Sequence, residues 1–132
     1  AAPMWRGSGT VLVVDDEETV RLVAQRFLER MGFGVVTAGD GAEAVEILRR
    51  SAAAGHDQFA CVLLDLTMPG LDGAETLTRI HALGLKTPVL ISSGYDEHDL
   101  ALRFEGAGVT GFVQKPYRMV DLAAKLRAAI EG

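Results

Sequence analysis

The stretch Val11-Leu12-Val13-Val14-Asp15-Asp16 joins a short apolar run to a pair of aspartates, and two later stretches repeat this design. Asp65 closes the run Cys61-Val62-Leu63-Leu64, and Lys115-Pro116 closes Gly111-Phe112-Val113-Gln114. Apolar runs of this length are typical of strands buried on both faces of a parallel sheet. Because the carboxyl ends of such strands share one edge, we expect these charged residues to meet there.

Short apolar runs and helix-length segments alternate along the chain. The expected strands are Val11–Val14, Val35–Val36, Cys61–Leu64, Val89–Ile91 and Phe112–Val113, and the helical segments begin near Glu17, Gly41, Gly73, Glu97 and Met119. This alternation predicts an α/β fold, a doubly wound parallel sheet with helices on both faces. We expect the first helix to end at Gly32. Its core-facing stripe is expected to consist of Val20, Val23, Ala24, Phe27 and Met31. The last helix carries a second stripe, Leu122, Leu126 and Ile130.

Composition narrows the class of protein. The chain has 132 residues, 48% hydrophobic and 23% charged, which suits one domain with a single core. A net charge of -5 argues against a nucleic-acid-binding surface, and no apolar stretch reaches the roughly 20 residues that a membrane span requires. The single cysteine, Cys61, lies inside an apolar run and is interpreted as a core residue rather than a reactive thiol.

The two ends and one loop are less regular. Residues 1–9 mix glycine, serine and proline with an isolated Trp5, so we interpret them as a linker or a remnant of cloning. Residues 10–132 form the expected domain. The stretch Ser51–Asp57 is interpreted as a helix end followed by a loop.

The expected edge gathers groups that suit a metal ion. Three carboxylates without a counter-charge repel one another, whereas Mg²⁺ takes carboxylate and phosphate oxygens as ligands. Asp15 or Asp16 has an alternative role as a helix cap, but Asp65 precedes a loop and lacks that explanation. Ser92 and Ser93 end the fourth run, where a serine is often only a turn residue. Lys115 could likewise be an ordinary surface charge.

Four motifs occur in order along the chain: Val13-Val14-Asp15-Asp16-Glu17, Leu63-Leu64-Asp65-Leu66-Thr67-Met68-Pro69-Gly70-Leu71-Asp72-Gly73, Ser92-Ser93-Gly94-Tyr95 and Gln114-Lys115-Pro116-Tyr117. Together they resemble the receiver domain of two-component response regulators, over about Thr10 to Ile130. The resemblance implies a flavodoxin-like sheet of order 2-1-3-4-5. It also implies that strands one and three are neighbours.

The resemblance assigns roles to individual residues. Asp65 would be the phosphoacceptor, and Mg²⁺, for which Mn²⁺ could substitute, would bind Asp15, Asp16, Asp65 and the backbone carbonyl of Thr67. Lys115 and Ser93 would contact phosphoryl oxygens, and the Lys115–Pro116 bond would be cis. Such a domain catalyses only its own phosphorylation and dephosphorylation, largely by positioning and charge neutralisation.

The resemblance also implies a switch. Phosphorylation would draw Ser93 inward, and Phe112 would follow it. Many family members have tyrosine at this position, so the switch would lack one hydrogen bond here. Phe112 could instead be a core residue.

Partners follow from the same resemblance. The donor would be a histidine kinase or a histidine-phosphotransfer protein, with Leu22 as an exposed contact on the first helix, and two copies could pair through the fourth helix, fifth strand and last helix. The parent chain is expected to be a hybrid histidine kinase, because receivers at the carboxyl end of such kinases resemble the combination of Ser93-Gly94-Tyr95-Asp96-Glu97 with Phe112-Val113-Gln114-Lys115-Pro116-Tyr117. A stand-alone regulator and an inert receiver-like module are the alternatives.

We expect the domain to be cytoplasmic, although its parent chain could be membrane-anchored.

A phosphatase of the haloacid-dehalogenase type is a rival class. It also uses an aspartate nucleophile at a strand end, but usually places a second aspartate two residues later. Thr67 occupies that position here, and no insertion of cap-domain size exists.

Overall fold

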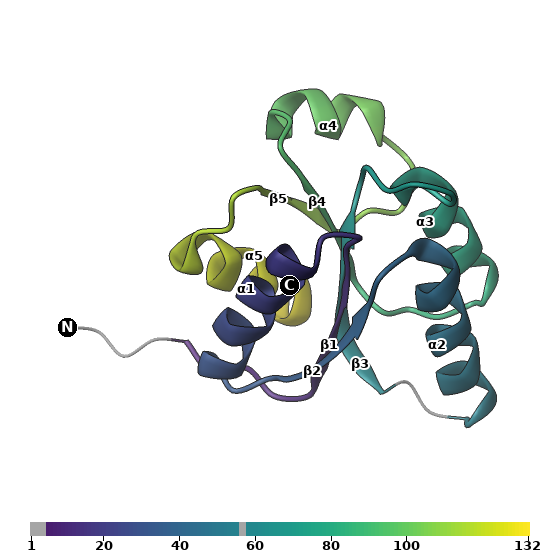
Figure 1. Ribbon diagram of the computed structural model, residues 1–132, viewed down its shortest axis with the longest axis horizontal. Coiled ribbons are helices and arrows are strands. Elements are labelled where there is room, and N and C mark those ends of the chain that lie inside the picture. The colour runs from purple at the N-terminus through teal and green to yellow at the C-terminus, as the bar shows by residue number, and fades with distance from the viewer. Residues whose placement is uncertain (1–4, 56–57) are drawn as a thin grey trace.

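The computed structural model describes residues 5–55 and 58–132. Five strands form one sheet, with the bounds β1 (Thr10–Val14), β2 (Gly34–Ala38), β3 (Phe59–Asp65), β4 (Val89–Ser93) and β5 (Gly111–Gln114). The strands are parallel and lie in the order β2-β1-β3-β4-β5 (Figure 1). This confirms the predicted fold and strand order.

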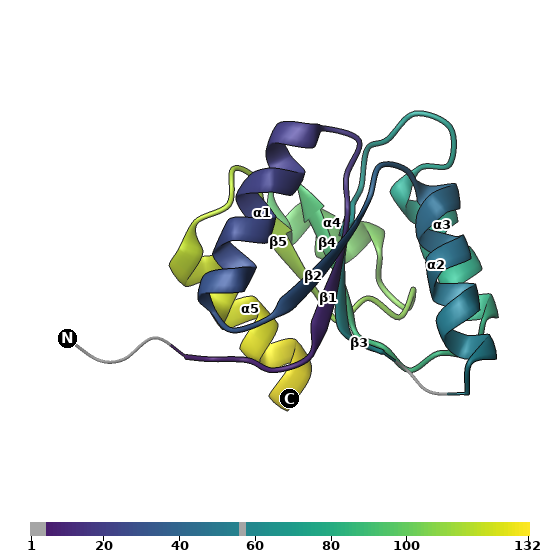
Figure 2. The same ribbon diagram turned by 60° about the horizontal axis from the view of Figure 1, so that its bottom comes forward.

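Five helices connect and cover the strands: α1 (Glu18–Arg30), α2 (Gly41–Ala53), α3 (Gly73–Ala82), α4 (Glu97–Arg103) and α5 (Met119–Glu131). Figure 2 shows α1 and α5 on one side of the sheet, and α2 and α3 on the other. Leu100 of α4 and Phe104 directly after it pack into the core on the α2/α3 side of the sheet. Alternate residues of β4 contribute to the two layers, Leu90 to the α1/α5 layer and Ile91 to the opposite one.

The helix starts show how local sequence sets the fold. The side chains of Asp40, Asp72 and Asp96 each accept a backbone N–H in the first turn of α2, α3 and α4, respectively. These are N-caps, which typically stabilise a helix by about 1 kcal/mol. Helices α1 and α5 differ, because their N-cap side chains accept no backbone N–H.

The core stripe of α1 is shifted from the predicted one. Ala24, Leu28 and Met31 are fully buried, whereas Val23 is 39% exposed, so its assignment to the core was wrong. The buried face is centred on Ala24 and Leu28, which places Val23 at the margin of the helix. Leu22 is 45% exposed, as predicted.

Cys61 belongs to the core between β3 and the α1/α5 layer, as predicted. Its side chain is inaccessible to solvent. Burial raises the pKa of the Cys61 thiol to about 12, so the thiolate is absent near neutral pH.

The segment before β1 packs against the domain. The indole of Trp5 donates a hydrogen bond of 3.0 Å to Glu131 at the end of α5, and its ring centroid lies 5.8 Å from that of Phe33. Gly7 N–H donates to the carbonyl of Met31 at 2.8 Å. The described part of the predicted linker therefore contacts both α5 and the α1–β2 connection. Residues 1–4 of that linker, and His56 and Asp57 of the predicted loop, lie outside the described residues.

No helix among the described residues has the length and apolar character needed to cross a membrane.

The packing of Trp5 leads to a stability prediction. Trp5→Ala removes a half-buried ring and a hydrogen bond, so we expect the free energy of unfolding to fall by about 1–2 kcal/mol in urea denaturation. Trp5→Phe, the matched control, keeps the ring against Phe33 and should lose less than half of that amount. An unfolding midpoint of Trp5→Ala equal to that of the wild type would show that the segment does not stabilise the domain.

Candidate functional site: an acidic pocket at the carboxyl edge of the sheet

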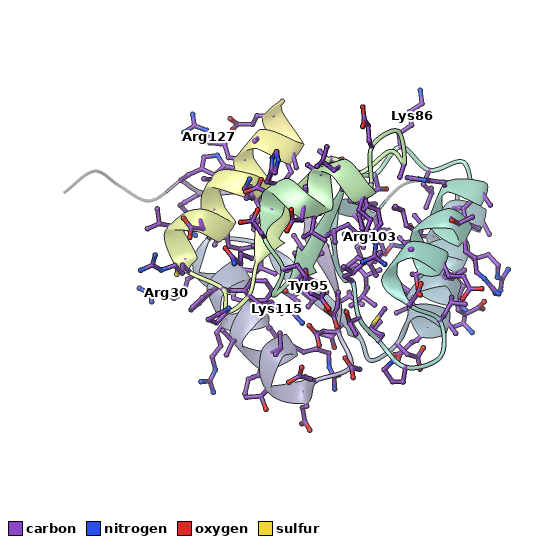
Figure 3. All side chains as sticks on the ribbon, turned by 90° about the horizontal axis from the view of Figure 1, so that it is seen from above. Arg30, Lys86, Tyr95, Arg103, Lys115 and Arg127 are labelled. Carbon is purple, nitrogen blue, oxygen red and sulfur yellow. The ribbon has the colours of Figure 1, made fainter. Side chains whose placement is uncertain are left out.

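The charged residues that end β1, β3 and β5 meet at one edge of the sheet, as the sequence predicted. Asp15 follows β1, Asp65 ends β3 and Lys115 follows β5. Figure 3 looks down on the molecule and labels Lys115 and Tyr95, which come from the loops after β5 and β4. The Lys115–Pro116 peptide bond is cis, as predicted.

Lys115 bridges the two buried carboxylates. Its Nζ lies 2.6 Å from Asp15 Oδ2 and donates a hydrogen bond of 2.9 Å to Asp65 Oδ1. The side chains of Asp15 and Asp65 are 1% and 5% exposed, so water contributes little to their solvation. Burying one charge of such a set without its partner would cost several kcal/mol. The three groups therefore depend on one another.

The protonation equilibria reflect this arrangement. Burial raises the pKa of the Asp65 carboxyl, the ammonium of Lys115 opposes that rise, and the carboxylate of Asp15 adds to it. Burial alone would lower the pKa of Lys115, but the close carboxylates of Asp15 and Asp65 outweigh it and raise that pKa above its ordinary value. Lys115 is thus a permanent cation in the pocket.

Three consecutive acids form the other side of the site. Ligand atoms of Asp15, Asp16 and Glu17 lie within 4.8 Å of one another, with Asp15 buried and the other two exposed. Glu17 was missed as a candidate ligand, although its position directly after the two aspartates was the available signal. Asp65 is not part of this group of three acids. It is connected to Asp15 through Lys115, which contacts both carboxylates.

Neither aspartate of the pair caps a helix. The N-cap position of α1 is Glu17, whose N–H donates to Asp15 Oδ1 at 2.9 Å. Arg21, one turn into α1, donates a hydrogen bond of 2.7 Å to the carbonyl of Asp15 and holds the loop. Asp15 Oδ2 pairs with the Lys115 ammonium at 2.6 Å and has no hydrogen-bond partner in the described part of the chain. A carboxylate oxygen paired only with a cation can also bind a metal ion.

The loop after β3 is held close to the pocket by α3. Gly73 N–H donates to the carbonyl of Leu66 at 2.9 Å. A Cβ on Gly73 would lie 2.6 Å from Leu66 Cα, so only glycine allows this close approach. Thr67 lies on the exposed part of the loop, where it shares a hollow with Tyr95 and Arg103.

Ser93 and Phe112 occupy the face of the sheet opposite α1. Ser93 is 3% exposed, and its Oγ accepts a hydrogen bond of 2.9 Å from Tyr95 N–H. Phe112 is half-buried against the core, with its ring centroid 6.1 Å from that of Phe104.

Ser92 and Tyr117 form a contact that the sequence did not predict. The Oγ of Ser92 and the OH of Tyr117 lie 2.6 Å apart, and Ser92 is completely buried. Burial raises the pKa of Tyr117 to about 12. Tyr117 also lines an apolar groove of about 310 Å³ beside the pocket, together with Thr19, Val20, Val23, Lys115 and Pro116.

Comparison with known proteins agrees with this geometry. The model of the response regulator receiver domain family matches residues 11–127. The chain belongs to the response regulator receiver family. It is therefore a receiver domain of two-component signalling, a family in which aspartate phosphorylation and Mg²⁺ are typical.

The curated relatives that match are longer than this chain. The transcriptional regulatory protein PrrA of Mycobacterium tuberculosis is 35% identical over 123 residues, which cover 93% of this chain and 50% of PrrA. The chain thus spans about half the length of such curated relatives.

Solved receiver domains of histidine kinases are also similar. The receiver of the hybrid histidine kinase CckA is 33% identical, with a TM-score of 0.74 over 92% of this chain and 99% of that chain. The receiver of the Arabidopsis thaliana histidine kinase CKI1, solved with Mg²⁺ and BeF₃⁻, is 29% identical, with a TM-score of 0.81 over 96% of this chain and 92% of that chain.

Proposed function

We propose that this receiver domain accepts a phosphoryl group on Asp65 from a phosphohistidine of a histidine kinase or a histidine-phosphotransfer protein. The observation that carries the proposal is the ammonium of Lys115, which lies between the buried carboxylates of Asp15 and Asp65. A cation held at this point can neutralise charge that arrives on Asp65.

The proposed transfer is an in-line displacement at phosphorus. A carboxylate oxygen of Asp65 forms the new P–O bond, while the P–N bond of the phosphohistidine breaks. The imidazole leaves with the electron pair of that bond and takes up a proton. Lys115 Nζ already donates to Asp65, so it can follow the negative charge onto a phosphoryl oxygen without a large rearrangement.

The acidic side of the pocket suits Mg²⁺. Asp15 offers a buried oxygen that is paired with the Lys115 ammonium but has no hydrogen-bond partner in the described part of the chain, and Asp16 is an adjacent carboxylate. We propose that Asp15, Asp16, Asp65 and the carbonyl of Thr67 hold the ion, with Glu17 close to it. When bound, Mg²⁺ would neutralise the phosphoryl oxygens as a Lewis acid. Mn²⁺ prefers similar ligands and could substitute.

Ser93 and Phe112 are the proposed switch. The hydroxyl of Ser93 now accepts from Tyr95 N–H, and it would turn to donate to a phosphoryl oxygen on Asp65. Phe112 would then move toward the space that Ser93 leaves, away from Phe104. This would alter the surface of α4, β5 and α5, where Glu97 and Lys125 form an ion pair between two helices. We propose this surface as the place where two copies would pair.

Phosphorylation of Asp65 is tested by intact-mass spectrometry after incubation with acetyl phosphate and Mg²⁺. We expect the mass to increase by one phosphoryl group in the wild type, and no increase in Asp65→Ala or with a chelator. Asp40→Ala is a matched control, because Asp40 caps α2 and has no proposed role in the pocket, so its loss should leave labelling intact. An unlabelled wild type under conditions that label another receiver would contradict the proposal and favour an inert interaction module.

The apolar groove beside Lys115 is the proposed docking site for the histidine-bearing partner. Val23 lines the groove and is 39% exposed, so a partner helix packed there would bring its histidine close to the pocket. Leu22 lies on the adjacent surface of α1, near Thr37 and Gln25. It stays a proposed contact at the margin of the interface.

Docking is tested by phosphotransfer from a phosphorylated histidine-phosphotransfer domain. Val23→Asp and Leu22→Asp should slow transfer about tenfold, which corresponds to a loss of about 1.4 kcal/mol of binding energy. Labelling by acetyl phosphate should stay unchanged, because it needs no docking. Leu102→Asp, at an apolar position on α4 that is even more exposed, serves as the control. Equal transfer rates in all three variants would exclude docking on α1.

We propose that the domain belongs to a hybrid histidine kinase. The similarity to the receivers of CckA and CKI1 supports this, whereas the similarity to PrrA favours a regulator with a separate output domain. Since histidine kinases take their phosphoryl groups from ATP, the proposed activity implies a cytoplasmic location.

An antibody against this chain distinguishes the two parents. If the parent is a hybrid kinase, the native polypeptide should be far larger than 14.1 kDa and should label itself from ATP on a histidine. A native polypeptide that is labelled only when a separate kinase is added would contradict the hybrid assignment.

A further inference from the structure

The hydroxyl pair of Ser92 and Tyr117 lies directly behind the acidic pocket. Ser92 is the register partner of Asp65 in the sheet, and its side chain is completely buried. Ser92 faces the α1/α5 layer. Leu90, which lies two residues earlier on the same face of β4, and Val113, the register partner of Ser92 in β5, both belong to that core. The hydroxyl therefore stands in an otherwise apolar layer.

This pair is not required for packing alone. Two apolar side chains of similar shape could fill the same space, and a buried hydroxyl costs about 1–3 kcal/mol when it has no partner. At 2.6 Å one hydroxyl donates to the other, so each has a hydrogen-bond partner. Ser92 and Tyr117 thus form a unit that fixes one specific distance between β4 and the loop after β5.

Backbone carbonyls at the end of β4 bind both the segment after Asp65 and the backbone of Lys115. Leu66 N–H, directly after Asp65, donates to the carbonyl of Ser92 at 2.9 Å. Lys115 N–H donates to the carbonyl of Ser93 at 2.8 Å. The Lys115 bond holds the loop after β5 on one side of Pro116, whereas the bond between Ser92 and Tyr117 holds that loop on the other side.

A loop anchored only before Pro116 could still swing outward. Lysine has a long and flexible side chain, and its ammonium must stay within hydrogen-bond distance of two separate carboxylates. Displacing a catalytic group by about 1 Å can lower a rate a hundredfold. The Ser92–Tyr117 hydrogen bond can therefore affect the rate of phosphoryl transfer through the position of Lys115.

We propose that the Ser92–Tyr117 hydroxyl pair is a positioning element, which holds the Lys115 ammonium between Asp15 and Asp65 and thereby sets the rate of phosphoryl transfer to Asp65. Neither residue touches the phosphoryl group. The inference rests on the proposed phosphorylation of Asp65 and adds two residues that act through Lys115.

The first test is a cycle of variants labelled with acetyl phosphate and Mg²⁺. Ser92→Ala and Tyr117→Phe should each lower the labelling rate constant about fivefold, and the double variant should lose no more than either single one. In a Lys115→Ala background, Ser92→Ala should change the remaining rate by less than about twofold, because its effect passes through Lys115. A general loss of packing would lower the rate in both backgrounds and would overturn the inference.

The second test observes Lys115 without any phosphorylation. In ¹H–¹⁵N spectra, the ammonium of Lys115 should give a resonance protected from exchange with water in the wild type. It should broaden or disappear in Ser92→Ala and Tyr117→Phe. An unchanged resonance would overturn the inference. If the wild type shows this resonance but is not labelled, the proposed function fails while the positioning of Lys115 stands.

Discussion

Two buried carboxylates and one partly buried ammonium at the end of a parallel sheet impose the strongest constraint on this domain. Asp15 and Asp65 are nearly inaccessible to water, and their mutual repulsion is offset by Lys115 Nζ, at 2.6 and 2.9 Å from their oxygens. The three residues come from three different strand ends. Any change in the strand register or in the loop after β5 would separate them, so the fold and the charges of the pocket are coupled.

The apolar sheet makes this arrangement possible. Its central strands are covered on both faces, and polar side chains appear only where the strands end. The exception is the hydroxyl pair of Ser92 and Tyr117, which lies one layer behind the charges and satisfies itself. Charges, hydroxyls and backbone bonds thus hold Lys115 from several sides, which is the preorganisation that electrostatic catalysis requires.

The sequence was sufficient for the fold and for most of the pocket. Short apolar runs that end in Asp15, Asp65 and Lys115 locate these residues at strand ends, and a parallel sheet brings strand ends together whatever the details of packing. The register between β3 and β4, which pairs Asp65 with Ser92, was not predictable from periodicity alone.

Other features depend on tertiary contacts. Val23 fits a helical apolar stripe, but the angle at which α1 packs leaves it exposed beside Lys115. Trp5 precedes the first strand in a stretch rich in glycine, and its partners Phe33 and Glu131 are distant in sequence. Glu17 lies near the metal candidates because α1 begins directly after it. Local patterns carry no information on such contacts.

The most direct test of the central claim is a crystal structure of the domain with Mg²⁺ and beryllofluoride, a mimic of the phosphoryl group. We expect the fluoride mimic on Asp65, with Lys115 Nζ bound to a fluorine and released from Asp15, and with Asp15 and Asp16 on the metal side. The account is contradicted if Lys115 stays paired with Asp15 and makes no contact with the mimic, or if the mimic binds away from Asp65.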